Sequence, residues 1–318
     1  MGIKMSKARL ITTNEEIKVN NATLEMREKK LLKCYTENCN AKVTWVRLSK
    51  ENYEVKNRYY RLLNGEQHCM ECCYNTLGRV TIIAKKADKK IIENINNNKF
   101  EFRVNIVYEA LKTNNSKEEL NTNIHNTSDV NRKKKVYKPI GVASPHLAVM
   151  KDIMKLRSEI EDKKELEDII KIKSKGKSIA WKNFYYELGE EETLYKYIDN
   201  NGYVYKENLR KLSYPICIEG IIDSEIEYNE AGSSFINFKL SKYINPDETG
   251  NLNFYKCTLF TGNKNLIDSI NNSIRENKRI KIVSYFIPTI SYKANGKYKN
   301  YQISGWVNHE QQIYIESI

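Results

Sequence analysis

The spacing of cysteine and histidine most constrains the fold of this 318-residue chain. Five of its seven cysteines fall between Cys34 and Cys73. A Cys-x4-Cys pair comes first and a His-x3-Cys pair follows, at Cys34, Cys39, His68 and Cys72. Clustered cysteines in a chain without an apolar, signal-like start indicate a metal site before disulfide bridges.

Two alternating apolar runs, residues 41–48 and 53–63, separate the pairs and predict a β-hairpin. The hairpin would bring the pairs together, and Zn²⁺ prefers four tetrahedral sulfur and nitrogen ligands. We therefore predict a Zn²⁺ site formed by the two pairs. Four protein ligands leave no open position for water, so the predicted site is structural rather than catalytic.

Three alternatives remain open for this cysteine cluster. Cys69 or Cys73 could replace Cys72 as the fourth ligand. Cys69 and Cys72 also form a C-x-x-C pair, which is typical of redox sites. The thiols could instead be free and buried.

The predicted hairpin is basic and aromatic. Its basic and aromatic side chains are Lys42, Trp45, Arg47, Lys56, Arg58, Tyr59, Tyr60 and Arg61. Residues 30–75 resemble the zinc-ribbon modules of bacterial and phage DNA-handling proteins. The resemblance implies a nucleic-acid contact, and the alternative is a solvated charged hairpin. The expected zinc-ribbon α+β domain spans residues 26–111.

The formal net charge of +13 favours a polyanionic partner, either nucleic acid or an anionic membrane. No apolar run approaches the length of a membrane span, so we expect a cytoplasmic protein that does not use a membrane.

The remaining N-terminal and middle segments give weaker patterns. Residues before Met26 are polar and predict an irregular end. Residues 79–84 predict a strand and 88–96 a helix, with a further strand starting at Phe100. Asn, Ser, Thr and basic residues predict a linker at 112–138.

Residues 139–205 predict a helical middle region. Ser144-Pro145 is typical of a helix start, with serine as N-cap and proline at the first helical position. Periodic apolar residues predict a second helical piece near 166–170 and a third at 191–198.

The chain from residue 212 onward predicts mostly strands. The expected strands are 215–226, 233–240, 253–260, 279–290 and 298–307, with a helix at 263–276 between the third and the fourth. The strand at 253–260 alternates strictly, so Tyr255, Cys257 and Leu259 share one face. Its other face carries two phenylalanines and a lysine.

Three strands, a helix and two strands is the order of a five-stranded OB-fold β-barrel. Residues 214–318 resemble the OB domain of bacterial single-stranded-DNA-binding proteins, within an expected domain at 212–318. The motif is aromatic-x-basic-x3-aromatic, followed by a glycine and a lysine: Phe254, Lys256, Phe260, Gly262 and Lys264. The family's tryptophans are replaced here by phenylalanine and tyrosine.

The resemblance implies that Phe254, Phe260, Tyr292 and Tyr243 stack on bases. The second strand adds Phe235 and Lys239 to the expected binding face, because rings and cations coincide there. We expect an α+β multidomain protein that binds single-stranded DNA or RNA in replication, recombination or repair, encoded by a phage or mobile element. Replication or recombination proteins are expected as further partners.

Two other classes of function remain as alternatives to this prediction. A protein-interaction module, such as an inhibitor of host defence, would hold a protein on the barrel. A metal-dependent nuclease needs carboxylates beside a lysine, and Glu54-Val55-Lys56 has that form without a partner aspartate.

Overall fold

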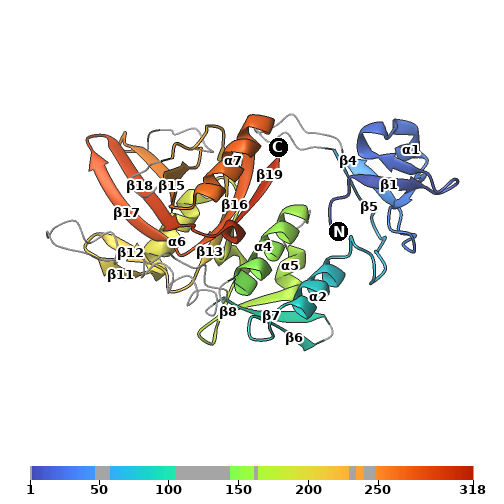
Figure 1. Ribbon diagram of the computed structural model, residues 1–318, viewed down its shortest axis with the longest axis horizontal. Helices are drawn as coiled ribbons and strands as arrows, with labels where there is room; N and C mark the ends of the chain where they lie inside the picture. The colour runs from blue at the N-terminus through green and yellow to red at the C-terminus, as the bar shows by residue number, and fades with distance from the viewer. Residues whose placement is uncertain are drawn as a thin grey trace, which may run out of the picture. The chain divides into compact units, whose positions relative to one another are not determined.

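The computed structural model describes residues 2–46, 58–96, 98–104, 144–160, 164–228, 234–239, 246 and 248–317. They form a mixed α+β protein in which sheets predominate (Figure 1). The chain divides into two compact units. The first unit comprises Met1–Glu101 and Asp152–Lys171, and the second Phe102–Lys151 and Ile172–Ser317.

The first unit begins with a three-stranded antiparallel sheet in the order β2-β1-β3, where an irregular end was predicted. A hairpin of β4 and β5 follows, as predicted from the alternating runs. The elements are β1 (Lys7–Leu10), β2 (Glu16–Lys18), η1 (Val19–Asn21), α1 (Leu24–Glu28), β3 (Leu32–Cys34), β4 (Val43–Val46) and β5 (Tyr59–Leu62). Ala8, Ile17, Leu32, Val43 and Tyr60 are buried together as the core of this module.

The predicted strand at 79–84 is wrong, because α2 (Thr76–Lys86) occupies these residues. Asn75 caps this helix, and Val80 and Ile83, three residues apart, face inward while Ile82 is exposed. The predicted helix at 88–96 is also wrong, since β6 (Ile92–Asn96) is a strand.

A four-stranded sheet runs in the order β6-β7-β8-β9. Its other strands are β7 (Lys99–Arg103), β8 (Ile170–Ser174) and β9 (Lys177–Ile179). The middle of the chain also holds the predicted helices as α4 (Ser144–Glu159), α5 (Lys164–Ile169) and α6 (Glu191–Asn201). The region is therefore mixed rather than purely helical, because short strands separate the helices.

The second unit contains two sheets. The four-stranded sheet has the order β10-β13-β16-β19, and the six-stranded sheet has the order β11-β12-β17-β18-β15-β14. The bounds are η2 (Trp181–Asn183), β10 (Tyr185–Tyr186), β11 (Tyr203–Lys206), β12 (Leu209–Lys211), β13 (Ile216–Ile222), β14 (Ser234–Asn237), β15 (Leu252–Thr261), α7 (Lys264–Asn277), β16 (Ile280–Phe286), β17 (Thr289–Asn295), β18 (Tyr298–Trp306), η3 (Glu310–Gln312) and β19 (Ile313–Ser317). The described ladders thus give two sheets and no closed five-stranded barrel.

The expected fourth strand at 279–290 is divided between these sheets. β16 pairs with β13, and the chain then passes into β17, which pairs with β18 (Figure 1). Gly296, at a φ of +58°, forms the predicted hairpin turn between β17 and β18. β15 pairs with β14 antiparallel and with β18 parallel, so it lies between them.

A large apolar core lies in the second unit. Leu194 and Ile198 of α6, Ile270 of α7, and Cys257 and Ile303 of the six-stranded sheet belong to it. The apolar stripe of α7 is spaced by three and four residues, as predicted, and α7 contacts β16 and β19.

Glycine allows close packing at Gly305 in this core. A Cβ added to Gly305 of β18 would lie 2.0 Å from Cδ2 of Phe286, which is fully buried, and 3.0 Å from the Ile287 carbonyl oxygen. A ring held in a packed core cannot move aside without disturbing its neighbours.

We predict that Gly305→Ala lowers the free energy of unfolding by about 1–3 kcal/mol, the range typical of overpacking. Chemical denaturation followed by circular dichroism measures it. Ser304→Ala, at the adjacent position that faces outward, is the control and should change stability little. Gly305→Ala/Phe286→Leu should recover part of the loss, and a fully additive double variant would contradict the proposed clash.

Candidate functional site

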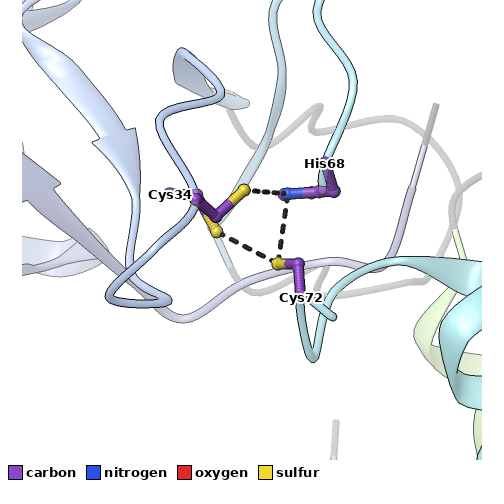
Figure 2. A group of neighbouring side chains, drawn as sticks. Cys34, His68 and Cys72 are labelled. Atoms are coloured by element: carbon purple, nitrogen blue, oxygen red, sulfur yellow. Dashed lines mark hydrogen bonds between the residues drawn. The ribbon is translucent and has the colours of Figure 1, made fainter. Parts of the chain in front are cut away.

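The structure brings together the four residues predicted as metal ligands. Cys34, Cys39, His68 and Cys72 are all buried, and their ligand atoms lie within 4.8 Å of one another. Figure 2 shows Cys34, His68 and Cys72 pointing toward a common centre.

The separations between these atoms match the edges of a metal-centred tetrahedron. The Sγ atoms of Cys34 and Cys72 are 3.5 Å apart. His68 Nδ1 lies 3.4 Å from Cys39 Sγ and 3.4 Å from Cys72 Sγ. Tetrahedral Zn–S and Zn–N bonds imply sulfur–sulfur edges of about 3.8 Å and nitrogen–sulfur edges of about 3.6 Å. The site needs only a small expansion to hold such an ion.

Local backbone structure places each pair of ligands. Cys34 ends β3, where its N–H donates to the Ala41 carbonyl, and a turn returns the chain to Cys39. The Asn75 side chain binds the second pair to α2. Its oxygen accepts from Gly78 N–H, and its amide nitrogen donates to the His68 and Cys69 carbonyls.

Hydrogen bonds among the ligands favour the thiolate form of Cys72, which can bind a cation. The hydrogen bond with Cys34 lowers the pKa of Cys72 well below its usual range, and the bond to His68 adds to this effect. The same pairing raises the pKa of Cys34. The Tyr74 N–H also donates to Cys72 Sγ at 3.4 Å. A metal ion would displace the shared proton and bind both sulfurs as thiolates.

The other cysteines of this segment lie outside the cluster. Cys69 and Cys73 are exposed, while Cys72 is buried among the other ligands. Cys73 Sγ lies 3.2 Å from the Thr36 hydroxyl. The geometry therefore favours Cys72 over Cys69 or Cys73 as the fourth ligand. All seven cysteines are free thiols, including the C-x-x-C pair.

Two aromatic residues of the predicted basic hairpin belong to the core. Tyr60 is fully buried, and Trp45 is buried with its Nε1–H donating to the Thr23 carbonyl. Arg27 and Arg58 lie over the Trp45 ring at 5.3 and 5.2 Å. Arg47, Glu54 and Lys56 fall outside the described residues. The hairpin rings therefore support packing more than contact with a ligand.

The second candidate site is one face of the six-stranded sheet. Ladder partners project to the same side, so the register defines two faces. On β14, β15, β17 and β18, we call outer face the side formed by Phe235, Asn237, Leu252, Phe254, Lys256, Thr258, Phe260, Thr289, Ser291, Lys293, Asn295, Tyr298, Asn300, Gln302, Ser304 and Trp306. None of these side chains is buried. β14, β15, β17 and β18 contain no aspartate or glutamate.

Five rings form two groups on the outer face. Phe235 pairs with Phe260, and Phe260 pairs with Trp306, so one row crosses three strands. Both ring pairs have centroids 5.5 Å apart. Phe254 and Tyr298 form the second group at 6.1 Å.

A lysine lies beside one of these rings, and two of the rings are exposed. The Lys256 Nζ lies 5.5 Å from the Phe254 ring centroid. Phe235 and Tyr298 are each 51% exposed. Side chains that are large, apolar and exposed on this scale mark a surface suited to contact.

Tyr292, which was predicted to stack on bases with Phe254 and Phe260, does not share their face of the sheet. Tyr292 pairs with Tyr301, whose neighbour in the ladder is Tyr255, so all three project to the opposite side. Tyr195 of α6 packs against Tyr301 and Tyr255 at 5.1 and 5.8 Å. Tyr292 is 47% exposed, but it extends the inner ring stack rather than the outer face.

Lys239 and Tyr243 complete the predicted set. Lys239 forms an ion pair with Asp223, which reduces its value as an anion contact. Tyr243 lies outside the described residues.

Sequence reasoning missed Tyr298 and Trp306. Their signal was the alternation of β18, where Tyr298, Asn300, Gln302 and Trp306 fall on even positions. The structure adds the parallel register with β15, which places Trp306 opposite Phe260.

Among the described helices, none is long and apolar enough to cross a membrane. The chain matches no family model, no curated protein and no solved structure in the three comparisons.

We predict that Cys72→Ser removes bound metal and lowers the thermal stability of the first unit, because a hydroxyl replaces a thiolate ligand. Elemental analysis of the purified protein and a thermal melt measure both effects. Cys73→Ser, one residue away and exposed, is the matched control and should keep the metal. Equal metal content in the two variants would contradict the assignment of Cys72.

Proposed function

We propose that the protein binds single-stranded nucleic acid on the outer face of its six-stranded sheet. The observation that carries the proposal is the composition of that face. It combines five rings with two lysines, and its four strands carry no carboxylate. Flat rings stack on bases of any sequence, and cations attract the phosphates between them.

The arrangement of the rings fits an extended strand. The two ring groups are centred on Phe254 and Phe260, six residues apart along β15. At about 3.3 Å per residue this is roughly 20 Å. A single strand crossing this distance would stack bases on both groups, with Lys256 between them. The amides of Asn300 and Gln302 lie on the same face and can contact base edges.

The order of the elements supports an OB-type arrangement of the second unit. β13, β14, β15, α7, the β16–β17 segment and β18 follow one another as expected for that fold. The Lys239 N–H donates to the Ile221 carbonyl, so the segment after β14 adjoins β13. This contact would bring the two sheets together along one edge. The fold and the outer face together favour DNA replication, recombination or repair as the setting.

We also propose that the cysteine–histidine cluster holds a structural Zn²⁺ ion. Three thiolates and one imidazole are ligands that zinc prefers. Burial of all four leaves no open position for a substrate. The ion would therefore supply folding energy to a module whose own core is small.

We predict that Phe260→Ala/Trp306→Ala lowers affinity for single-stranded oligonucleotides by on the order of 30-fold or more, since each stacked base contributes about 1–3 kcal/mol. Fluorescence anisotropy with labelled single-stranded DNA and RNA, and with duplex DNA, measures it. Tyr292→Ala is the matched control, because this exposed ring lies on the opposite face of the same sheet, and its affinity should stay close to wild type.

Three results would count against the proposal. Equal affinities of wild type and the double variant would remove the outer face from binding. A loss with Tyr292→Ala alone would place the site on the inner ring stack. No salt-sensitive binding by the metal-loaded wild type would leave a protein partner as the better occupant.

A further inference from the structure

The first unit carries a basic sheet face that the sequence patterns did not reveal. In the β2-β1-β3 sheet, Ala8, Ile17, Leu32 and Cys34 face inward, so the alternate residues face outward. The outward side chains, with that of Lys42 beside β3, form what we call the basic face: Lys7, Arg9, Glu16, Lys18, Lys33 and Lys42. Five of these six residues are cations.

The register places like charges directly opposite one another. Lys7 pairs with Lys18, Arg9 pairs with Lys33, and Lys33 pairs with Lys42. Like charges at facing positions of a sheet destabilise it. Glu16 offsets part of this repulsion, because it forms an ion pair with Lys7 at 2.7 Å and lies directly opposite Arg9 in the ladder. Glu66 also lies at the edge, where its carboxylate accepts from the Lys42 N–H. The remaining repulsion would be relieved by a bound polyanion.

Tyr35 holds two of the cations in place. Arg9 Nε donates to the Tyr35 carbonyl at 2.9 Å, and the guanidinium carbon lies 5.1 Å from the ring centroid. Lys7 Nζ lies over the same ring at 5.4 Å. The terminal amino groups of Arg9 have no hydrogen-bond partner within the described part of the chain. A guanidinium held in this way is suited to a phosphate, which it can bind through two parallel hydrogen bonds.

The basic face and the metal cluster share one strand. Cys34 points inward to the cluster, while its neighbours Lys33 and Tyr35 belong to the outward side. A metal ion that fixes Cys34 therefore also fixes β3 beneath the cations.

We propose that this basic face is a second nucleic-acid contact, which binds the phosphodiester backbone without reading bases. The choice of nucleic acid among polyanions rests on the proposed function of the outer face. The basic face holds one half-buried ring, that of Tyr35, between cations, whereas the outer face holds a row of rings that can stack on bases. The contribution of the basic face to binding is therefore electrostatic. Its loss should weaken binding similarly for all sequences and make binding less sensitive to salt.

The test compares metal-loaded variants of the 318-residue chain on a labelled single strand of about 40 nucleotides, well beyond the length that one OB-type site covers. Arg9→Gln/Lys33→Gln should lower affinity on the order of tenfold at low salt. It should also reduce the slope of log K against log salt by about 1.4, since each lost contact removes about 0.7 on single strands. Lys85→Gln/Lys86→Gln removes the same charge from the exposed end of α2 and should leave affinity and slope near wild type.

Folding and ligand identity need separate readouts. Lys33→Gln/Lys42→Gln leaves the Arg9–Tyr35 contact intact and should show the same change in slope, with metal content equal to wild type. A slope that stays at the wild-type value in both face variants would overturn the inference. An equal loss in the Lys85/Lys86 control would overturn it too, because net charge alone would then explain binding. The inference would also be overturned if the face variants lost binding to anionic vesicles but kept their affinity for the oligonucleotide.

Failure of the two proposals can be told apart. Phe260→Ala/Trp306→Ala reports on the outer face, and the lysine and arginine variants report on the basic face. If only the ring variant binds like wild type, the outer-face proposal fails and the basic face stands. If wild type binds no oligonucleotide, both are overturned.

Discussion

The parallel ladder between β15 and β18 is the contact on which the second unit's candidate site depends. It joins nine consecutive pairs, from Leu252 opposite Tyr298 to Phe260 opposite Trp306. A shift of one residue would turn every ring of β18 to the other side. The inner residues prevent such a shift, because Cys257, Leu259 and Ile303 are buried in the core. Core packing therefore sets the order of the rings on the surface.

The first unit would depend in the same way on its proposed metal ligands. Its core is small, and Cys34, Cys39 and Cys72 are part of it. The Sγ atoms of Cys34 and Cys72 lie 3.5 Å apart, and a hydrogen bond between them is weaker than the metal–thiolate bonds that an ion would form. The cysteines thus fill the core, and with the proposed ion they would also cross-link β3 to the loop before α2. This double role explains why a short sheet can carry facing cations on its outer side.

Local patterns in the sequence were enough for some of these features. The ligand spacing, the hairpin, the stripe of α7 and the alternation of β15 each depend on residues close in the chain. β-branched residues at 79–84 suggested a strand, but the Asn75 cap and the inward positions of Val80 and Ile83 make a helix. The ladder partner β18 lies far from β15 along the chain, and the partners of β1 are the short polar strands β2 and β3. No local pattern shows that Trp306 meets Phe260 or that Arg9 meets Lys33.

Two modest surfaces on one chain can act together through a flexible ligand. A single strand held on the outer face would raise the effective concentration of its free end near the basic face, provided that the strand is long enough to span the two faces. The first contact would supply stacking, which depends weakly on salt, and the second would supply phosphate contacts, which depend on salt strongly. Affinity should then rise steeply once an oligonucleotide is long enough to reach both. A length dependence of this kind follows from two separate faces and would not arise from one uniformly basic molecule.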